Sequence, residues 1–188
     1  MENLDDMKTM WLELNQRVKT LEEENRRLAH EAISNNLKTA QELLVRKYSR
    51  FIFVSLVMLI YIYLFVMFNQ FVVEKFRIPT LIYWSLFFLF EAGIDCYLML
   101  KVKEIDVFNS SITEISRQAK RNWKIHKIAI CIGFPLAIGA CILFGLLLNA
   151  DKFVILGMIT GGIVGLLIGI RQLMKFLKYY KQLQGQTE

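Results

Sequence analysis

The sequence predicts an all-α membrane protein, in which an N-terminal cytosolic helix of amphipathic, coiled-coil character precedes four transmembrane helices. Two observations lead to this fold class. Of the 188 residues, 55% are apolar, and most of these follow Tyr48, whereas residues 1–50 carry nine basic and nine acidic side chains. Only two prolines and ten glycines interrupt the chain, which favours long helices. We therefore expect a cytosolic helical segment over 1–50 and a four-helix transmembrane domain over 51–188.

The four spans follow from the lengths of the apolar stretches. A helix needs about 20 mostly apolar residues to cross the hydrocarbon core of a bilayer. The qualifying stretches are residues 51–70, 78–100, 128–148 and 153–170. A soluble fold would have to bury all four, and too few residues remain to cover them. This excludes a soluble class.

Residues 4–32 keep a heptad spacing, which predicts a coiled coil. Leu14, Val18, Leu21, Asn25 and Leu28 form its expected core, with Leu4, Met7, Trp11 and Ala32 completing the a and d positions. Leucine at d with one asparagine at a is typical of a parallel two-stranded coil. The alternatives are a helix that binds another cytosolic protein and a helix packed on the middle loop of this chain. Residues 37–45 are expected to extend the helix toward the membrane.

The second span contains two acidic residues, Glu91 and Asp95, four apart on one helix face. At about 1.5 Å per residue from Ile78, Glu91 lies about 20 Å into the crossing and Asp95 about 26 Å. Ionisable groups at such depths are rare and costly. They could form part of a proton or cation path. They could instead be structural, with Asp95 paired to Lys124, Lys127 or Arg171.

The third and fourth spans each carry a small residue at every fourth position, which lets helices approach closely in lipid. These residues are Gly133, Ala137, Cys141 and Gly145 in the third span, and Gly157, Gly161, Gly165 and Gly169 in the fourth. Counted outward from the turn near residue 151, the two ridges are in register. We therefore expect a tightly packed antiparallel hairpin, with a subunit-facing, pore-lining ridge as the alternative.

Charge predicts the topology and the lipid partners. Residues 1–50, 101–127 and 171–188 carry 20 of the 23 basic residues, which places both termini and the middle loop in the cytoplasm. We expect this loop and the tail to lie on anionic headgroups, with Trp123, Tyr179 and Tyr180 at interfacial depth. Ser111 and Glu114 predict a capping box that opens a helix. Because the basic residues are juxtamembrane, no nucleic-acid partner is expected.

Three runs together resemble a known group of proteins. They are residues 4–8 with 11–15, residues 103–107 with 113–117, and the glycine-ridged residues 158–170 with the basic tail 171–180. The chain resembles uncharacterised four-span inner-membrane proteins of Gram-negative anaerobic bacteria. Members of that group are often encoded near alternative sigma factors, which implies a membrane-bound, anti-sigma-like regulator in the inner membrane. The resemblance implies no site residues.

No phosphate-binding loop, zinc-protease motif, paired CxxC or nucleophile elbow occurs in the sequence. His30 and His126 are expected to be solvated polar residues. We therefore expect a protein that is not an enzyme and has no cofactor or metal. The predicted function is protein–protein interaction or regulation through the N-terminal helix. The alternative is a small oligomeric transporter or channel that uses Glu91 and Asp95.

Overall fold

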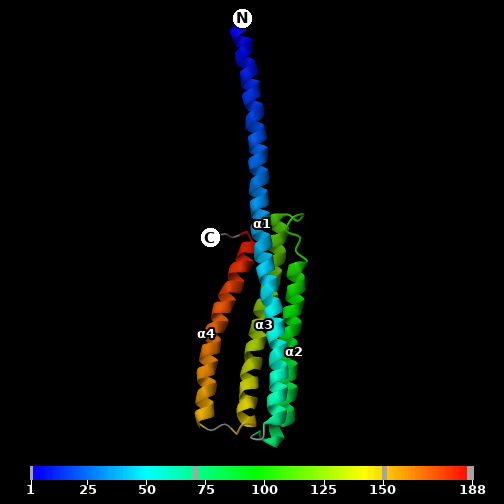
Figure 1. Cartoon of the computed structure of the whole chain (residues 1–188), viewed down its shortest axis with the longest axis vertical. Coiled ribbons are helices and arrows are strands. Elements are labelled where there is room, and N and C mark those ends of the chain that lie inside the picture. The colour runs from blue at the N-terminus through cyan, green and yellow to red at the C-terminus, as the bar shows by residue number, and fades with distance from the viewer. Residues whose placement is uncertain (1, 70–71, 150–151, 186–188) are drawn as a thin grey trace.

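The chain folds into four helices that lie side by side, one of them far longer than the rest (Figure 1). This computed structural model describes residues 2–69, 72–149 and 152–185, with side chains from Met7 onward. The helices are α1 (Glu2–Phe68), α2 (Glu74–Lys103), α3 (Ile112–Leu147) and α4 (Lys152–Leu183). Each is long and apolar enough to cross a membrane, which confirms a multi-pass, all-α membrane protein. The side chain of Leu4, an expected heptad position, and residue 70, the expected end of the first span, lie outside the described part of the structure.

The N-terminal segment is not a separate helix, contrary to the expected fold class. α1 runs unbroken for 67 residues from Glu2 into the first span, because no glycine or proline interrupts it. Its described residues 7–33 are all exposed, and Figure 1 shows this part projecting beyond the other three helices. Packing begins at Ser34 and follows one face of α1 through Leu37, Ala40 and Leu44.

The helices contact one another in ring order, α1 with α2, α2 with α3, α3 with α4 and α4 with α1. We call the end of the bundle that carries residues 34–50, 98–127 and 171–183 the basic end, and the opposite end the short-loop end. α2, α3 and α4 all extend beyond the expected spans at the basic end. The apolar stretches therefore make up only part of each helix.

The larger of two hydrophobic cores lies at the basic end, mostly outside the apolar stretches. Its buried residues are Leu37, Ala40, Leu44, Tyr48, Leu98, Val102, Ile105, Val107, Ile115, Ala119, Phe176, Tyr180 and Leu183. A smaller core of Ile62, Val66, Val72 and Leu147 closes the short-loop end. Between them, most side chains of the spans face outward, as expected where lipid is the solvent.

Side-chain hydrogen bonds tie the connection between α2 and α3 to this core. The Gln41 amide of α1 donates to the Val102 and Ile105 carbonyls, at 2.7 and 2.8 Å, near the end of α2. The Ser111 hydroxyl accepts a 3.2 Å bond from the Glu114 N–H, which confirms Ser111 as the N-cap of α3. Among the described residues, the Glu114 carboxylate accepts bonds from Arg117 and Gln118, so the reciprocal half of the expected capping box is not formed. The bonds from Gln41 and the bond to Ser111 satisfy backbone groups that helix ends leave without partners.

Candidate functional site

A largely buried polar cluster joins three helices at the basic end. The Tyr48 hydroxyl of α1 lies 3.0 Å from the Tyr180 hydroxyl of α4. The same hydroxyl lies 3.3 Å from Nδ1 of His126 in α3. Both tyrosines are fully buried. We call Tyr48, His126 and Tyr180 the Tyr–His cluster.

Aromatic rings enclose the Tyr–His cluster. The Phe176 ring centroid lies 5.0 Å from that of Tyr48 and 4.8 Å from that of His126. Trp123 stacks on His126 at 5.5 Å and contacts Tyr180 at 5.4 Å. Because the two tyrosines are fully buried, their hydroxyls depend on partners inside the bundle for hydrogen bonds, and the partly buried His126 imidazole supplies one of them.

Burial sets the charge state of the cluster, whose members lie outside the apolar stretches. Burial lowers the pKa of His126 to about 4, so the imidazole is neutral at pH 7. Burial also raises the pKa of Tyr48, and the nearby Tyr180 and Asp95 add to that rise. The pKa of Tyr180 rises to about 12 through burial, opposed by its bond with Tyr48 and aided by Asp95. A neutral chain of donors and acceptors results, which can pin three helices together or pass a proton.

The structure corrects the expectation that His126 is solvated, because its ring is partly buried against Tyr48 and Phe176. Tyr180 is fully buried inside the bundle, and its expected interfacial depth in a membrane stays a prediction. This burial arises because Phe176, Tyr180 and Leu183 share one face of α4, and this face closes onto α1 and α3.

Glu91 and Asp95 are half-buried on the inner side of α2. The Glu91 carboxylate lies against Gly133 of α3, where a Cβ would collide with it. Asp95 lies one turn nearer the Tyr–His cluster, close enough to affect the pKa of its two tyrosines. Within the described residues, Asp95 forms no ion pair with a lysine or arginine, so its expected pairing is wrong for this structure. Going from the apolar middle of α2 toward the basic end, Glu91 comes first, Asp95 second and the Tyr–His cluster third.

The expected small-against-small hairpin is not formed within the chain. Gly157, Gly161, Gly165 and Gly169 have no atom within 4 Å of where a Cβ would sit. Gly133 faces α2 rather than α4, since its neighbour is the Glu91 side chain. Bulky side chains such as Ile138, Ile142 and Leu166 point into the space between α3 and α4. This space is a groove that is also lined by Ala137, Cys141, Gly145, Gly165 and Gly169, among others.

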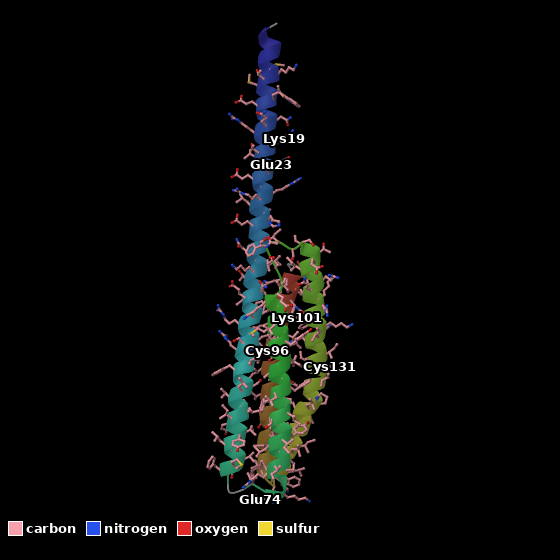
Figure 2. All side chains as sticks on the ribbon, turned by 90° about the vertical axis from the view of Figure 1, so that its right-hand side faces the viewer. Lys19, Glu23, Glu74, Cys96, Lys101 and Cys131 are labelled. Carbon is pink, nitrogen blue, oxygen red and sulfur yellow. The ribbon has the colours of Figure 1, made fainter. Side chains whose placement is uncertain are left out.

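The predicted coiled-coil residues are exposed on the projecting part of α1. Leu14, Val18, Leu21 and Leu28 have 64, 45, 59 and 52% of their surface accessible, and Asn25 is exposed too. Figure 2 shows the side chains of Lys19 and Glu23 pointing away from α1 well above the bundle. The alternative in which this helix packs on the middle loop of its own chain is therefore wrong.

Sequence reasoning missed the Tyr–His cluster, although a signal for it was present. Leu37, Ala40, Leu44 and Tyr48 recur at helical spacing and mark one face of α1. That face lies next to the first apolar stretch, whose hydropathy dominates the pattern. Among the residues that the structure describes, no group of His, Cys, Asp and Glu side chains could hold a metal ion.

Comparison with protein-family models, curated proteins and solved structures finds no significant match to this chain. The likeness to four-span inner-membrane proteins therefore stays a resemblance. Function has to be argued from the residues themselves.

Proposed function

We propose that this protein is a membrane-anchored interaction protein, not an enzyme, whose projecting N-terminal helix binds another protein from the cytoplasmic face of the inner membrane. The helical bundle anchors α1 in the membrane. The exposed apolar positions of residues 7–33 form the binding surface. The basic end, with its lysines and arginines, faces the cytoplasm in this proposal, in keeping with the positive-inside rule.

The exposed heptad carries the proposal. A helix in water gains most of its stability from packing its apolar face, and isolated helices are marginal even at about 12–15 residues. Residues 7–33 would extend about 40 Å at 1.5 Å per residue, and their leucines are not covered by any other part of the chain that the structure describes. An apolar stripe of this kind is typical of a helix that pairs with a partner.

A second copy of the chain is the partner that the heptad favours. Two copies anchored in one membrane present their helices in parallel, which is the orientation that paired asparagines at a specify. Arg17 at g would face Glu22 at e of the other copy. In one chain Arg17 contacts Glu13 at 3.6 Å, with both side chains largely exposed, and such a pair contributes little. Anchoring in the membrane also raises the local concentration of partners.

Light scattering of the detergent-solubilised protein tests the proposal. We expect full-length protein to be dimeric and a chain lacking residues 1–33 to be monomeric, because packing on the bundle starts at Ser34. Leu21→Asp should also give monomers. Leu12→Asp is the matched control, because Leu12 is equally exposed but lies at b, outside the core positions.

If the wild type is monomeric, self-association is wrong, and capture with residues 1–50 then tests for a cytosolic partner. Partner capture that Leu21→Asp abolishes and Leu12→Asp preserves would retain the wider proposal. A wild-type protein that neither dimerises nor captures a partner would refute the proposed interaction function.

Transport is the second candidate, and the placement of Glu91 and Asp95 favours it. The two carboxylates and the Tyr–His cluster form a polar series along the bundle toward the basic end. Such a series in a membrane is typical of a proton or cation path. Flux into liposomes separates the candidates. Transport predicts that Glu91→Gln abolishes flux while removal of residues 1–33 does not, and interaction predicts that only the truncation abolishes function.

A further inference from the structure

A groove lies between α3 and α4. Its volume is about 1120 Å³, and its lining is almost entirely apolar. On α4 the lining runs from Ile155 to Leu173, which is about 27 Å along the helix, close to the thickness of the hydrocarbon core of about 30 Å. At the basic end the lining ends at Ile130 on α3 and Leu173 on α4. The groove therefore lies within the lipid-facing part of the bundle.

The shape of the groove favours an acyl chain over a helix. A helix is a regular cylinder about 10 Å wide. The groove surface is irregular, because branched residues such as Ile138, Ile142 and Leu166 alternate with glycine, alanine and cysteine along both helices. Flexible hydrocarbon can fill an irregular apolar volume of this kind without a change in the protein.

Three lysines of α3 continue the same face beyond the basic end of the groove. Lys120, Lys124 and Lys127 each precede a lining residue, Ile138, Ile142 and Gly145 respectively, by 18 residues. Since 18 residues make five turns of helix, each lysine shares the direction of its lining residue. All three are exposed, and the Lys127 ammonium lies 5.9 Å from the Trp123 ring centroid. Positive charge thus borders the apolar groove at the depth where a phospholipid carries its phosphate.

We propose that this groove is a binding site for an anionic phospholipid, with its acyl chains between α3 and α4 and its phosphate against Lys124 and Lys127. The apolar lining supplies contact area for the chains. The lysines select the headgroup, since each basic residue near an anionic membrane surface contributes about 1 kcal/mol, or roughly fivefold in affinity. The site is independent of the projecting helix.

Native mass spectrometry of the intact protein tests this site. The protein would be exchanged into micelles that contain equimolar phosphatidylglycerol and phosphatidylcholine, and the retained lipid counted. We expect preferential retention of phosphatidylglycerol. Lys124→Gln with Lys127→Gln should lower that preference by roughly fivefold for each lysine. Lys175→Gln with Lys178→Gln is the matched control, because it removes the same charge from α4, on a face that does not line the groove.

Filling the groove supplies a second test that leaves charge unchanged. Gly165→Leu places a side chain in the groove without a clash and should reduce retention of both lipids. Gly161→Leu is the control, since Gly161 has equally open space but does not line the groove. Far-UV circular dichroism checks that each variant remains helical.

Two outcomes would overturn the proposal. One is equal retention of phosphatidylglycerol by the Lys124 and Lys127 variant and by its control. The other is a wild-type dimer that Gly165→Leu alone converts to monomer with no change in bound lipid, which would assign the groove to a second copy of the chain.

Discussion

Tyr48→Phe removes one oxygen atom from the centre of the Tyr–His cluster. The phenylalanine ring keeps the contact with Phe176, so packing is preserved. The Tyr180 hydroxyl and His126 Nδ1 each lose a hydrogen-bond partner among the surrounding aromatic rings. A net bond contributes about 1 kcal/mol, and a buried group left without a partner costs about 1–3 kcal/mol. We expect the free energy of unfolding to fall by about 2 kcal/mol.

Thermal unfolding in detergent, followed by circular dichroism, measures this loss. For a chain of this size, about 2 kcal/mol corresponds to a fall in Tm of roughly 4–8 °C. Tyr61→Phe is the control, because Tyr61 is 58% exposed on the same helix and its hydroxyl has no place in the cluster. The double variant with Tyr180→Phe should lose less than the sum of the single losses, since the two hydroxyls share one bond. Additive losses, or a Tyr48→Phe effect no larger than that of Tyr61→Phe, would refute the reasoning.

Three further predictions concern the same end of the bundle. Burial holds the pKa of His126 near 4, whereas the unfolded imidazole titrates near about 6.5, so the unfolded state binds more protons between these values. The free energy of unfolding should therefore fall by up to about 3 kcal/mol from pH 7 to pH 4. His126→Gln should flatten that part of the Tm–pH curve relative to wild type. Leu44→Ala should cost about 2–5 kcal/mol in chemical unfolding, whereas Leu64→Ala, at a position 49% exposed, should cost under about 1 kcal/mol. Gln41→Leu should lower the free energy of unfolding by about 1–2 kcal/mol and speed amide exchange at the end of α2, because the Val102 and Ile105 carbonyls lose the bond from the Gln41 amide. Unchanged amide exchange would contradict that role of Gln41.

The four helices could be predicted because hydropathy reports the solvent that each stretch meets. A run such as 128–148 has to be helical in lipid, where backbone groups find no water. The cap at Ser111 could also be predicted, since it depends on residues three apart. The ends of the helices at the short-loop end were close to expectation. At the basic end they were not, because amphipathic turns outside the lipid carry no strong hydropathy signal.

The acidic pair and the glycine ridges show where prediction from sequence stopped. The spacing of Glu91 and Asp95 placed them on one face of a helix, but it did not predict which helix that face would contact. Small residues at matched levels suggested close contact between the third and fourth helices. In the structure, members of both ridges line an open groove together with larger residues, and Gly133 lies against the Glu91 carboxylate of α2.

The sequence by itself determined the class of protein, the four crossings and the heptad spacing of residues 4–32, because composition and periodicity are properties of each segment alone. The exposure of residues 7–33 was decided by the structure. Only the tertiary structure decided that residues 34–48 belong to the bundle. It also decided that Tyr48, His126 and Tyr180 meet, and that α3 and α4 leave a groove between them. The physical reason is that burial and helix separation depend on side chains from distant segments, whose fit no local pattern records.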